Sequence, residues 1–120
     1  MHPAQPFLLD EWLTEWAPHP PVYGPATRFL EALIDTQPEN AWDFIQALVE
    51  RATDDALDWV GAGPLEDLLC EHGPALIDRV ERLATTNARF RKCLTSVWGE
   101  NRMEPSTYAR MKTAAGGVKK

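Results

Sequence analysis

The 120-residue sequence contains little that favours β-structure. β-branched residues do not alternate with polar ones over any stretch, and no Asn-Gly or Asp-Gly turn separates two apolar runs. Such alternation and such turns are the main sequence signals of strands and hairpins. Their absence argues against a sheet-based fold and leaves an all-α domain as the expectation.

Long apolar runs and a cysteine framework are missing as well. No apolar run approaches the roughly 20 residues that span a bilayer. Acidic residues already stand at Asp10 and Glu11, where a secretory signal would carry its apolar segment. Cys70 and Cys93 show no CxxC spacing, which favours a reducing compartment over a disulfide framework. We therefore expect a cytoplasmic protein that does not associate with membranes.

Common signatures of catalysis are also absent from the sequence. The segment Gly61-Ala62-Gly63 lacks the third glycine and the Lys-Ser/Thr pair of phosphate-binding loops. A zinc site built from Cys70, His72 and Cys93 would lack a fourth ligand, and on a helix Cys70 points away from His72. Spacing suggests no Ser/His/Asp or Cys/His set. We therefore expect a non-catalytic protein without a cofactor or metal.

The sequence does contain apolar residues at helical spacing, in stretches that often begin just after a proline. Proline is tolerated in the first turn of a helix, because its missing N–H would have no partner there. Six prolines precede stretches with helical spacing of apolar residues: Pro6, Pro25, Pro38, Pro64, Pro74 and Pro105. Together with the apolar spacing they predict helices over about 6–17, 25–36, 38–52, from 54 to 60, within 64–72, and over 74–85 and 87–99.

Short connections between these helices favour antiparallel neighbours. We therefore predict a single domain over residues 1–112, built as a compact stack of about six to seven short helices in hairpins, similar to an irregular HEAT-like bundle. Residues 113–120, with Gly116-Gly117 and terminal lysines, are expected to form a disordered tail.

The block from Gly61 to Pro74 predicts two helix boundaries. Gly61 and Gly63 can end a helix because glycine adopts φ > 0 without a Cβ clash, and Pro64 then suits the first turn of the next one. Gly73 and Pro74 repeat the combination after one short helix. The chain is therefore expected to stop and restart a helix at both places.

The apolar spacing also separates inner from outer positions. It places Trp12 and Trp16 inward and Glu15 outward on the first helix, and it places Phe90 and Trp98 inward on the helix over 87–99. Three polar contacts are expected. Asp78 pairs with Arg82 at i,i+4, Glu66 accepts from backbone N–H groups of a neighbouring turn, and Thr53 or Asp54 caps the short helix from 54.

Charge is divided unevenly along the chain, whose net charge is −6. Residues 1–78 contain fifteen acids and two bases, whereas residues 79–120 contain three acids and ten bases. Two interpretations are open: the two parts attract each other in the folded state, or one of them forms an interaction surface. Nucleic acid is disfavoured as a partner, because the isoelectric point is near 5.0 and Phe90 is expected in the core.

An acidic face on consecutive helices could steer a basic protein partner, with Trp59 or Tyr23 as an aromatic anchor. The candidate partner-binding residues are Glu39, Asp43, Asp54, Asp55, Asp58, Trp59, Asp67 and Glu71. The concrete hypothesis is a cytoplasmic immunity or inhibitor protein that neutralises a toxin. Two alternatives stay open: a metal-dependent enzyme that uses Asp54, Asp55, Asp58 and Glu66, and a self-associating adaptor that pairs acidic and basic parts of two copies.

The segment from Ala41-Trp42 to Trp98 resembles a small bacterial all-helical domain of unknown function. The motifs that carry the resemblance are Gly-x-Gly-Pro-Leu-Glu-Asp-Leu-Leu at 61–69, the pair His72-Gly73, Phe-Arg-x-x-Leu at 90–94, and Val97-Trp98. They lie within residues 41–98, about half of the chain. The resemblance implies an all-helical fold, and since the family has no established activity, no catalytic residues can be carried over from it.

Overall fold

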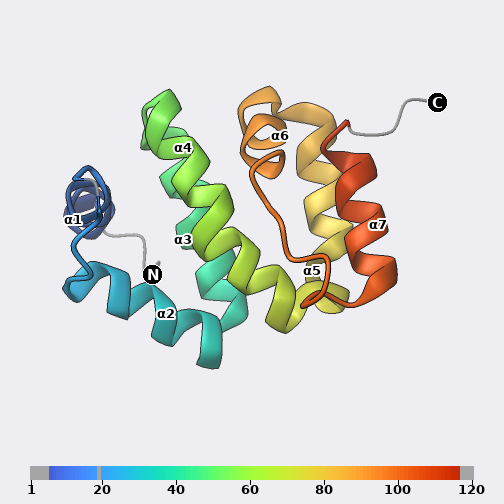
Figure 1. The fold of residues 1–120 in the computed structure, drawn as a ribbon, viewed down its shortest axis with the longest axis horizontal. Coiled ribbons are helices and arrows are strands. Elements are labelled where there is room, and N and C mark those ends of the chain that lie inside the picture. The colour runs from blue at the N-terminus through green and yellow to red at the C-terminus, as the bar shows by residue number, and fades with distance from the viewer. Residues whose placement is uncertain (1–5, 19, 117–120) are drawn as a thin grey trace.

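The computed structural model describes residues 6–18 and 20–116, which form helices and connecting turns and contain no strand. In chain order the helices of these residues are α1 (Pro6–Trp16), α2 (Pro25–Thr36), α3 (Pro38–Arg51), α4 (Asp54–Val60), the π-helical η1 (Gly61–Leu65), α5 (Glu66–Thr86), α6 (Ala88–Leu94) and α7 (Pro105–Ala114) (Figure 1). The predicted all-α class is confirmed. None of these helices combines the length and apolar character needed to cross a membrane.

Proline and capping residues begin several of these helices as expected. Pro25, Pro38 and Pro105 occupy the first turns of α2, α3 and α7. Thr53 caps α4, since its hydroxyl accepts from the backbone N–H of Ala56 at 3.2 Å. The side chain of Asn87 caps α6 by the same type of bond from Phe90 N at 2.9 Å. Local chemistry therefore fixes these starts.

Helix α3 forms the centre of the core and lies behind α4 in Figure 1. Its buried side chains contact α2 on one side and α6 on the other; Trp42 meets Phe90 of α6 edge to face, with ring centroids 5.6 Å apart. Both rings are buried, as their spacing predicted. The buried residues of α3 are Ala41, Trp42, Phe44, Ile45, Leu48 and Val49.

The predicted helix end at Gly61 is wrong. The chain continues from α4 through the π-helical turn η1 directly into α5, and Gly61 has an ordinary helical φ of −68°. A proline inside an α-helix loses a hydrogen bond and presses its ring against the carbonyl four residues earlier. The wider turn of a π-helix accommodates Pro64 without ending the helix.

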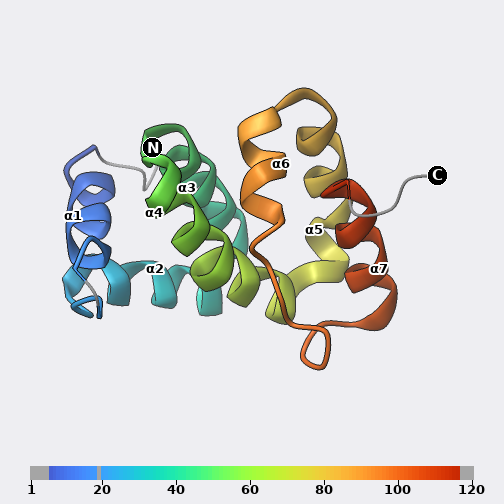
Figure 2. The ribbon, with the colours of Figure 1, turned by 45° about the horizontal axis from the view of Figure 1, so that its top comes forward.

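The second predicted boundary, at Gly73-Pro74, exists as a kink. Residue His72 leaves helical geometry, with φ −132° and ψ 17°, and the chain changes direction within α5 (Figures 1 and 2). A Cβ atom at Gly73 would lie 2.5 Å from Thr107 Cγ2 of α7. Glycine is therefore needed here because α7 packs closely against α5, not because it ends a helix.

Helix α6 ends at Leu94, earlier than the predicted Gly99. Tighter turns follow, and the backbone N–H of Trp98 donates to the Glu66 carboxylate at 3.0 Å instead of continuing the helix. The expected acceptor role of Glu66 is thus confirmed. The inward position expected for Trp98 is wrong, because its side chain is 69% exposed.

The C-terminal helix α7 includes Thr113 and Ala114, which were expected in a disordered tail; residues 117–120 lie outside the described residues. The expected pairing of Asp78 with Arg82 is replaced by a contact to α7, because Arg110 Nη2 lies 2.7 Å from Asp78 Oδ1. Arg110 also pairs with Glu81 at 2.6 Å, and these contacts hold α7 beside α5.

Candidate functional site

A cleft of 440 Å³ lies between α1, α2, α4 and η1, and its walls are rich in aromatic side chains. We call it the aromatic cleft. The rings of Trp16 and Tyr23 are 5.4 Å apart, and those of Trp16 and Trp59 are 5.9 Å apart. Carboxylates of Glu31 and Asp67 also line it. The full lining is Trp12, Trp16, Pro21, Tyr23, Thr27, Leu30, Glu31, Ile34, Trp59, Ala62, Gly63, Pro64 and Asp67.

The wall at Trp16 is held by a buried carboxylate that the helical pattern placed outside. Glu15 is 7% exposed and accepts four hydrogen bonds from the start of α2. The donors are the backbone N–H groups of Gly24, Ala26 and Thr27, and the Thr27 hydroxyl. A carboxylate satisfies the unpaired N–H groups at a helix N-terminus and complements the helix dipole. The expected outward position of Glu15 is therefore wrong.

Burial by itself raises the pKa of Glu15, but the hydrogen bonds from the Thr27 side chain and from the backbone N–H groups of Ala26, Thr27 and Gly24 outweigh it and lower the pKa. The Thr27 hydroxyl also accepts from Trp16 Nε1 at 3.0 Å. A single buried network therefore caps α2 and orients the indole that forms the cleft wall. The sequence signal that could have suggested this network is the proximity along the chain of Glu15, Trp16, Gly24 and Thr27.

The opposite wall is supplied by the π-helical turn. Ala62, Gly63 and Pro64 line the cleft, and a Cβ atom at Gly63 would lie 3.8 Å from Trp16 Cη2, an ordinary contact. At Gly61 a Cβ atom would instead lie 2.2 Å from the carbonyl oxygen of Cys93. The first glycine therefore permits close packing with α6, and the second leaves space in the cleft.

Trp59 of α4 borders two further hollows beside the aromatic cleft. One, of 300 Å³, lies between α1 and α4 and includes Trp16, Arg51 and Asp55 in its lining. The other, of 780 Å³, extends from α4 to the exposed Trp98, and we call it the Trp98 groove. Its lining is Ala17, Asp55, Asp58, Trp59, Ala62, Thr95, Ser96 and Trp98. Trp59, half-buried, therefore lies where all three hollows meet.

Acidic side chains adjoin the aromatic cleft on the α2–α5 side. Glu31 and Asp67 also line a neighbouring hollow of 250 Å³, together with Ile34, Asp35 and Glu71. Burial and a hydrogen bond with Asp35 raise the pKa of Glu71, and the charge of Asp35 adds to the effect. Four carboxylates therefore crowd one side of the cleft, and their repulsion opposes a further negative charge there.

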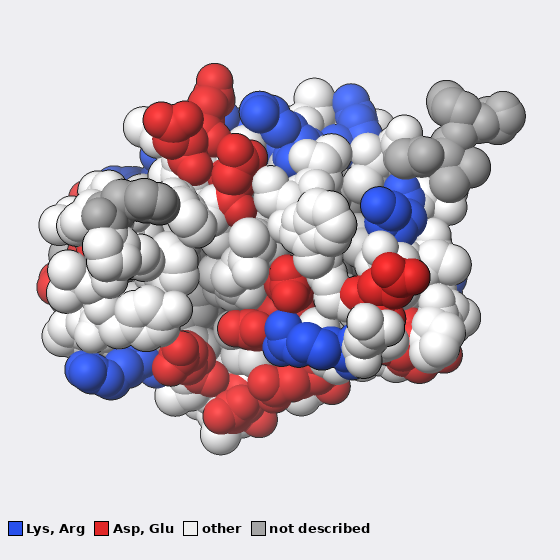
Figure 3. All heavy atoms as spheres, in the orientation of Figure 1, with Lys and Arg blue, Asp and Glu red and all other residues white. Residues whose placement is uncertain are grey.

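The acidic residues of α4 fall into a second group. Figure 3 shows red side chains gathered where α4 lies in Figure 1, and further acids lower on the same face around a basic side chain. Asp54 contacts α6, because its Oδ1 lies 3.6 Å from Arg89 Nη1. Asp58 accepts from the Ser96 hydroxyl at 3.1 Å. Asp55 is exposed and faces two of the hollows.

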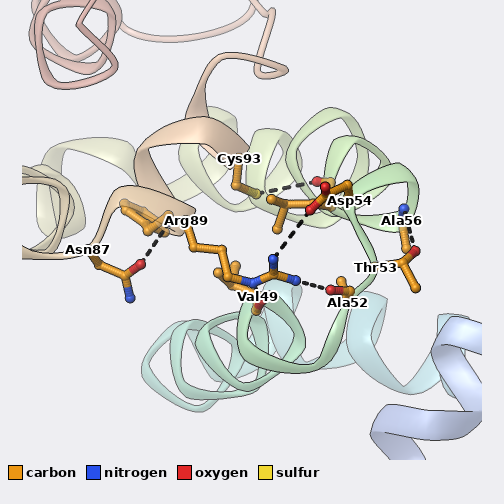
Figure 4. A network of polar contacts seen from close by, with 10 residues as sticks. Val49, Ala52, Thr53, Asp54, Ala56, Asn87, Arg89 and Cys93 are labelled. Atoms are coloured by element: carbon orange, nitrogen blue, oxygen red, sulfur yellow. Dashed lines mark hydrogen bonds and ion pairs between the residues drawn. The ribbon is translucent and has the colours of Figure 1, made fainter.

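Arg89 joins three elements at this point (Figure 4). Its Nε donates to the carbonyl of Val49 at 2.7 Å, and its Nη2 donates to the carbonyl of Ala52. These carbonyls belong to the end of α3, where the last turn leaves acceptors without helical partners. Arg89 thereby caps α3 from α6 while it also contacts Asp54 at the start of α4.

The same pattern of acid–base pairing recurs along the chain. Glu39 pairs with Arg79 at 2.9 Å, and Arg102 pairs with Glu66 at 3.0 Å and with Asp67 at 3.2 Å. Each contact joins an acid of residues 1–78 to a base of residues 79–120. The interpretation that the two parts attract each other is therefore confirmed for these residues. Glu39 and Asp43, on α3, line none of the three hollows around Trp59.

The residues considered for metal or zinc binding do not converge. His72 lies 2.7 Å from the carbonyl oxygen of Ile34, and since a carbonyl only accepts, Nε2 carries the proton and donates. The Cys93 thiol is buried and donates to the carbonyl of Leu57 at 3.5 Å. Within residues 6–18 and 20–116, no group of three or more His, Cys, Asp or Glu side chains is placed to hold a metal ion. Both cysteines are free thiols.

Comparison with known proteins assigns the chain to a family. The model of a "Family of unknown function (DUF6869)" matches residues 19–118, so the chain belongs to that family. The match includes residues 19–40 and the C-terminal region, which the motif resemblance did not cover. No curated protein matches the sequence. No solved structure matches it either.

Proposed function

We propose that this member of a family of unknown function is a non-catalytic protein-binding module, and that the surface around Trp59 receives a basic segment of its partner. The observation that carries the proposal is the position of Trp59 where three hollows meet, with carboxylates on both sides. Asp55 and Asp58 flank it toward the Trp98 groove, and Glu31 and Asp67 flank it toward the aromatic cleft.

Aromatic side chains in partly buried positions commonly supply the strongest contacts of an interface. Trp59 is half-buried, and Tyr23 and Trp98 are 56% and 69% exposed, so each presents apolar surface beside acidic groups. Opposite charges on two partners speed their encounter and disfavour wrong partners. A basic segment fits this surface better than an acidic or a purely apolar one.

In its concrete form, the proposal is that the protein acts in the cytoplasm as an immunity or inhibitor protein that neutralises a toxin or another basic protein. Free cysteines accord with a reducing compartment. Self-association is less well supported, because four of the arginines that a second copy would offer form ion pairs within the chain. These arginines are Arg79, Arg89, Arg102 and Arg110.

The test is a pull-down from native cells with two charge-reversal variants. Glu31→Lys/Asp55→Lys changes one exposed carboxylate on each side of Trp59. Asp43→Lys/Glu50→Lys makes the same change in net charge on exposed positions of α3. We expect the wild type and the α3 variant to retain a stoichiometric partner that the first variant loses.

Thermal unfolding of both variants checks that each remains folded. Retention by both variants, or equal loss from both, would remove the surface around Trp59 from the interface. Absence of any stoichiometric partner for the folded wild type would contradict the binding module itself.

A further inference from the structure

We propose that the aromatic cleft binds an arginine side chain of the partner's basic segment. This inference rests on the proposed function and names the chemistry of its central contact. Two features carry it: aromatic rings that form a continuous wall, and carboxylates at the rim of the same cleft.

The aromatic wall brings several rings into contact with one another. Trp16 is tilted by 41° from the ring of Tyr23 and by 47° from that of Trp59. Trp12, which also lines the cleft, stacks on Trp16 with centroids 5.1 Å apart and is itself buried. The face of an aromatic ring attracts a cation, and the attraction is strongest for tryptophan. Trp16 is further fixed by its bond to Thr27, so the wall is preorganised.

The carboxylates supply the matching charge. Glu31 is exposed at the rim, and Asp67 contacts Arg102 through Oδ1. Asp35 and Glu71 lie in the adjoining hollow, so four acidic groups from α2 and α5 surround this side of the cleft. Burial, a hydrogen bond with Asp35 and the charge of Asp35 raise the pKa of Glu71. A bound cation would favour the charged forms of these carboxylates.

Arginine fits this combination better than lysine does. A guanidinium group is planar, stacks on aromatic faces, and donates two parallel hydrogen bonds to one carboxylate. It is also more weakly hydrated than an ammonium group, so less solvation is lost when it enters a partly enclosed site. A cleft of 440 Å³ can hold the planar head group together with its aliphatic stem.

The test uses the folded protein and three blocked pentapeptides, Gly-Gly-X-Gly-Gly, in which X is arginine, lysine or citrulline. Citrulline keeps the shape of arginine and removes its charge. Binding is followed by NMR shifts of the tryptophan indole N–H signals. We expect shifts at Trp16 and Trp59, with the arginine peptide binding at least about fivefold more tightly than the citrulline peptide and more tightly than the lysine peptide.

Variants place the contact within the cleft. Glu31→Gln removes the charge at the rim and keeps the size of the side chain, and Tyr23→Ala removes an exposed ring from the wall. Each variant should bind the arginine peptide at least about threefold more weakly than the wild type does. The matched control is Phe7→Ala, which removes an exposed ring of α1 that lines none of the hollows around Trp59. It should leave the affinity for the peptide unchanged.

Equal affinity for the arginine and citrulline peptides, equal effects of Tyr23→Ala and Phe7→Ala, or absence of indole shifts at millimolar peptide would each overturn the arginine assignment. The proposed function is judged separately by the charge-reversal pull-down. If Glu31→Lys/Asp55→Lys still loses the partner while the peptides fail, the binding module stands and the arginine assignment falls.

Discussion

Trp16 donates its indole N–H to the hydroxyl of Thr27 at 3.0 Å, and the same hydroxyl donates to the Glu15 carboxylate at 2.6 Å. One buried oxygen thus connects the wall of the aromatic cleft to the cap of α2. The contact explains why a glutamate and a threonine lie in the interior next to the candidate site. Substitutions at Thr27 and Glu15 test this network directly.

Replacing Thr27 by valine keeps the shape of the side chain but removes both hydrogen bonds. Because Glu15 and Trp16 would each lose a buried partner, we expect a loss of about 1–3 kcal/mol in the free energy of unfolding, measured by urea denaturation. Thr36→Val is the matched control on α2, since the Thr36 hydroxyl is exposed and donates to Ala32 of its own helix. It should change stability by less than about 0.5 kcal/mol. Equal effects of the two variants would contradict the role of the network.

The lowered pKa of Glu15 makes stability depend on pH in a defined direction. A carboxyl group whose pKa is lower in the folded state stabilises that state at pH values above its unfolded pKa, here near 4.5, and loses this contribution as pH falls through the folded value. Glu15→Gln removes the titrating group. The stability difference between wild type and variant, measured by denaturation from pH 3 to 7, should therefore shrink below about pH 4.5. Parallel pH profiles would show that Glu15 does not titrate in this way.

Arg89 is expected to stabilise the junction of α3, α4 and α6. Arg89→Ala leaves the carbonyls of Val49 and Ala52 without this donor, and hydrogen bonds from a charged group typically contribute about 1.5–3 kcal/mol each. We expect a loss near the lower end of that range, because a third of the side chain is exposed. Arg89→Lys should restore only part of it, since an ammonium lacks the planar fork. Lys92→Ala, at an exposed position of α6, is the control, and a loss as large as that of Arg89→Ala would argue against the cap.

Replacing each of the two glycines of the π-helical turn by alanine should change stability by different amounts. At Gly61 the added methyl group would lie 2.2 Å from the Cys93 carbonyl oxygen, so the variant should lose at least about 1–3 kcal/mol of stability. At Gly63 the nearest heavy atom would be Trp16 Cη2 at 3.8 Å, so Gly63→Ala should stay within about 1 kcal/mol of wild type. Thermal unfolding of both variants distinguishes the two roles. Similar melting temperatures would refute the close approach at Gly61.

The Cys93 thiol should resist modification in the native protein. Burial raises the pKa of Cys93 to about 12, and the nearby charge of Asp58 adds to the effect, so little reactive thiolate forms near neutral pH. Alkylation followed by mass spectrometry should label Cys93 only as the protein unfolds, so its rate should rise with urea. Cys70, half-buried, provides the internal comparison. Rapid labelling of Cys93 without denaturant would contradict the packing of α6 on α4.

Local sequence signals predicted most helix starts and much of the core. Pro25, Pro38 and Thr53 act through the first turn of their own helix, so neighbours in the sequence are sufficient to identify them. Apolar spacing likewise predicted the burial of Trp42 and Phe90, because a helix buries one face whatever its partner is.

Predictions failed where the position of a residue depends on contacts with another segment of the chain. Glu15 was assigned to the polar face because only the start of α2, folded back against α1, makes its burial favourable. Trp98 was assigned to the core because its spacing continues α6, yet α6 ends at Leu94 and the backbone N–H of Trp98 donates to the Glu66 carboxylate. Neither partner lies within the helix that carries the residue.

The candidate site shows the same division. The sequence by itself identified Trp59, Tyr23 and an excess of acidic residues, since each is recognisable by type and by its polar neighbours. Only the tertiary structure decided which acids pair with bases within the chain and which line the aromatic cleft, where Asp67 does both, because ion pairs depend on the distance between side chains from different helices. Composition and periodicity therefore fixed an all-α domain with surplus negative charge, whereas the packing of α1, α2 and α4 around Trp16 created the cleft.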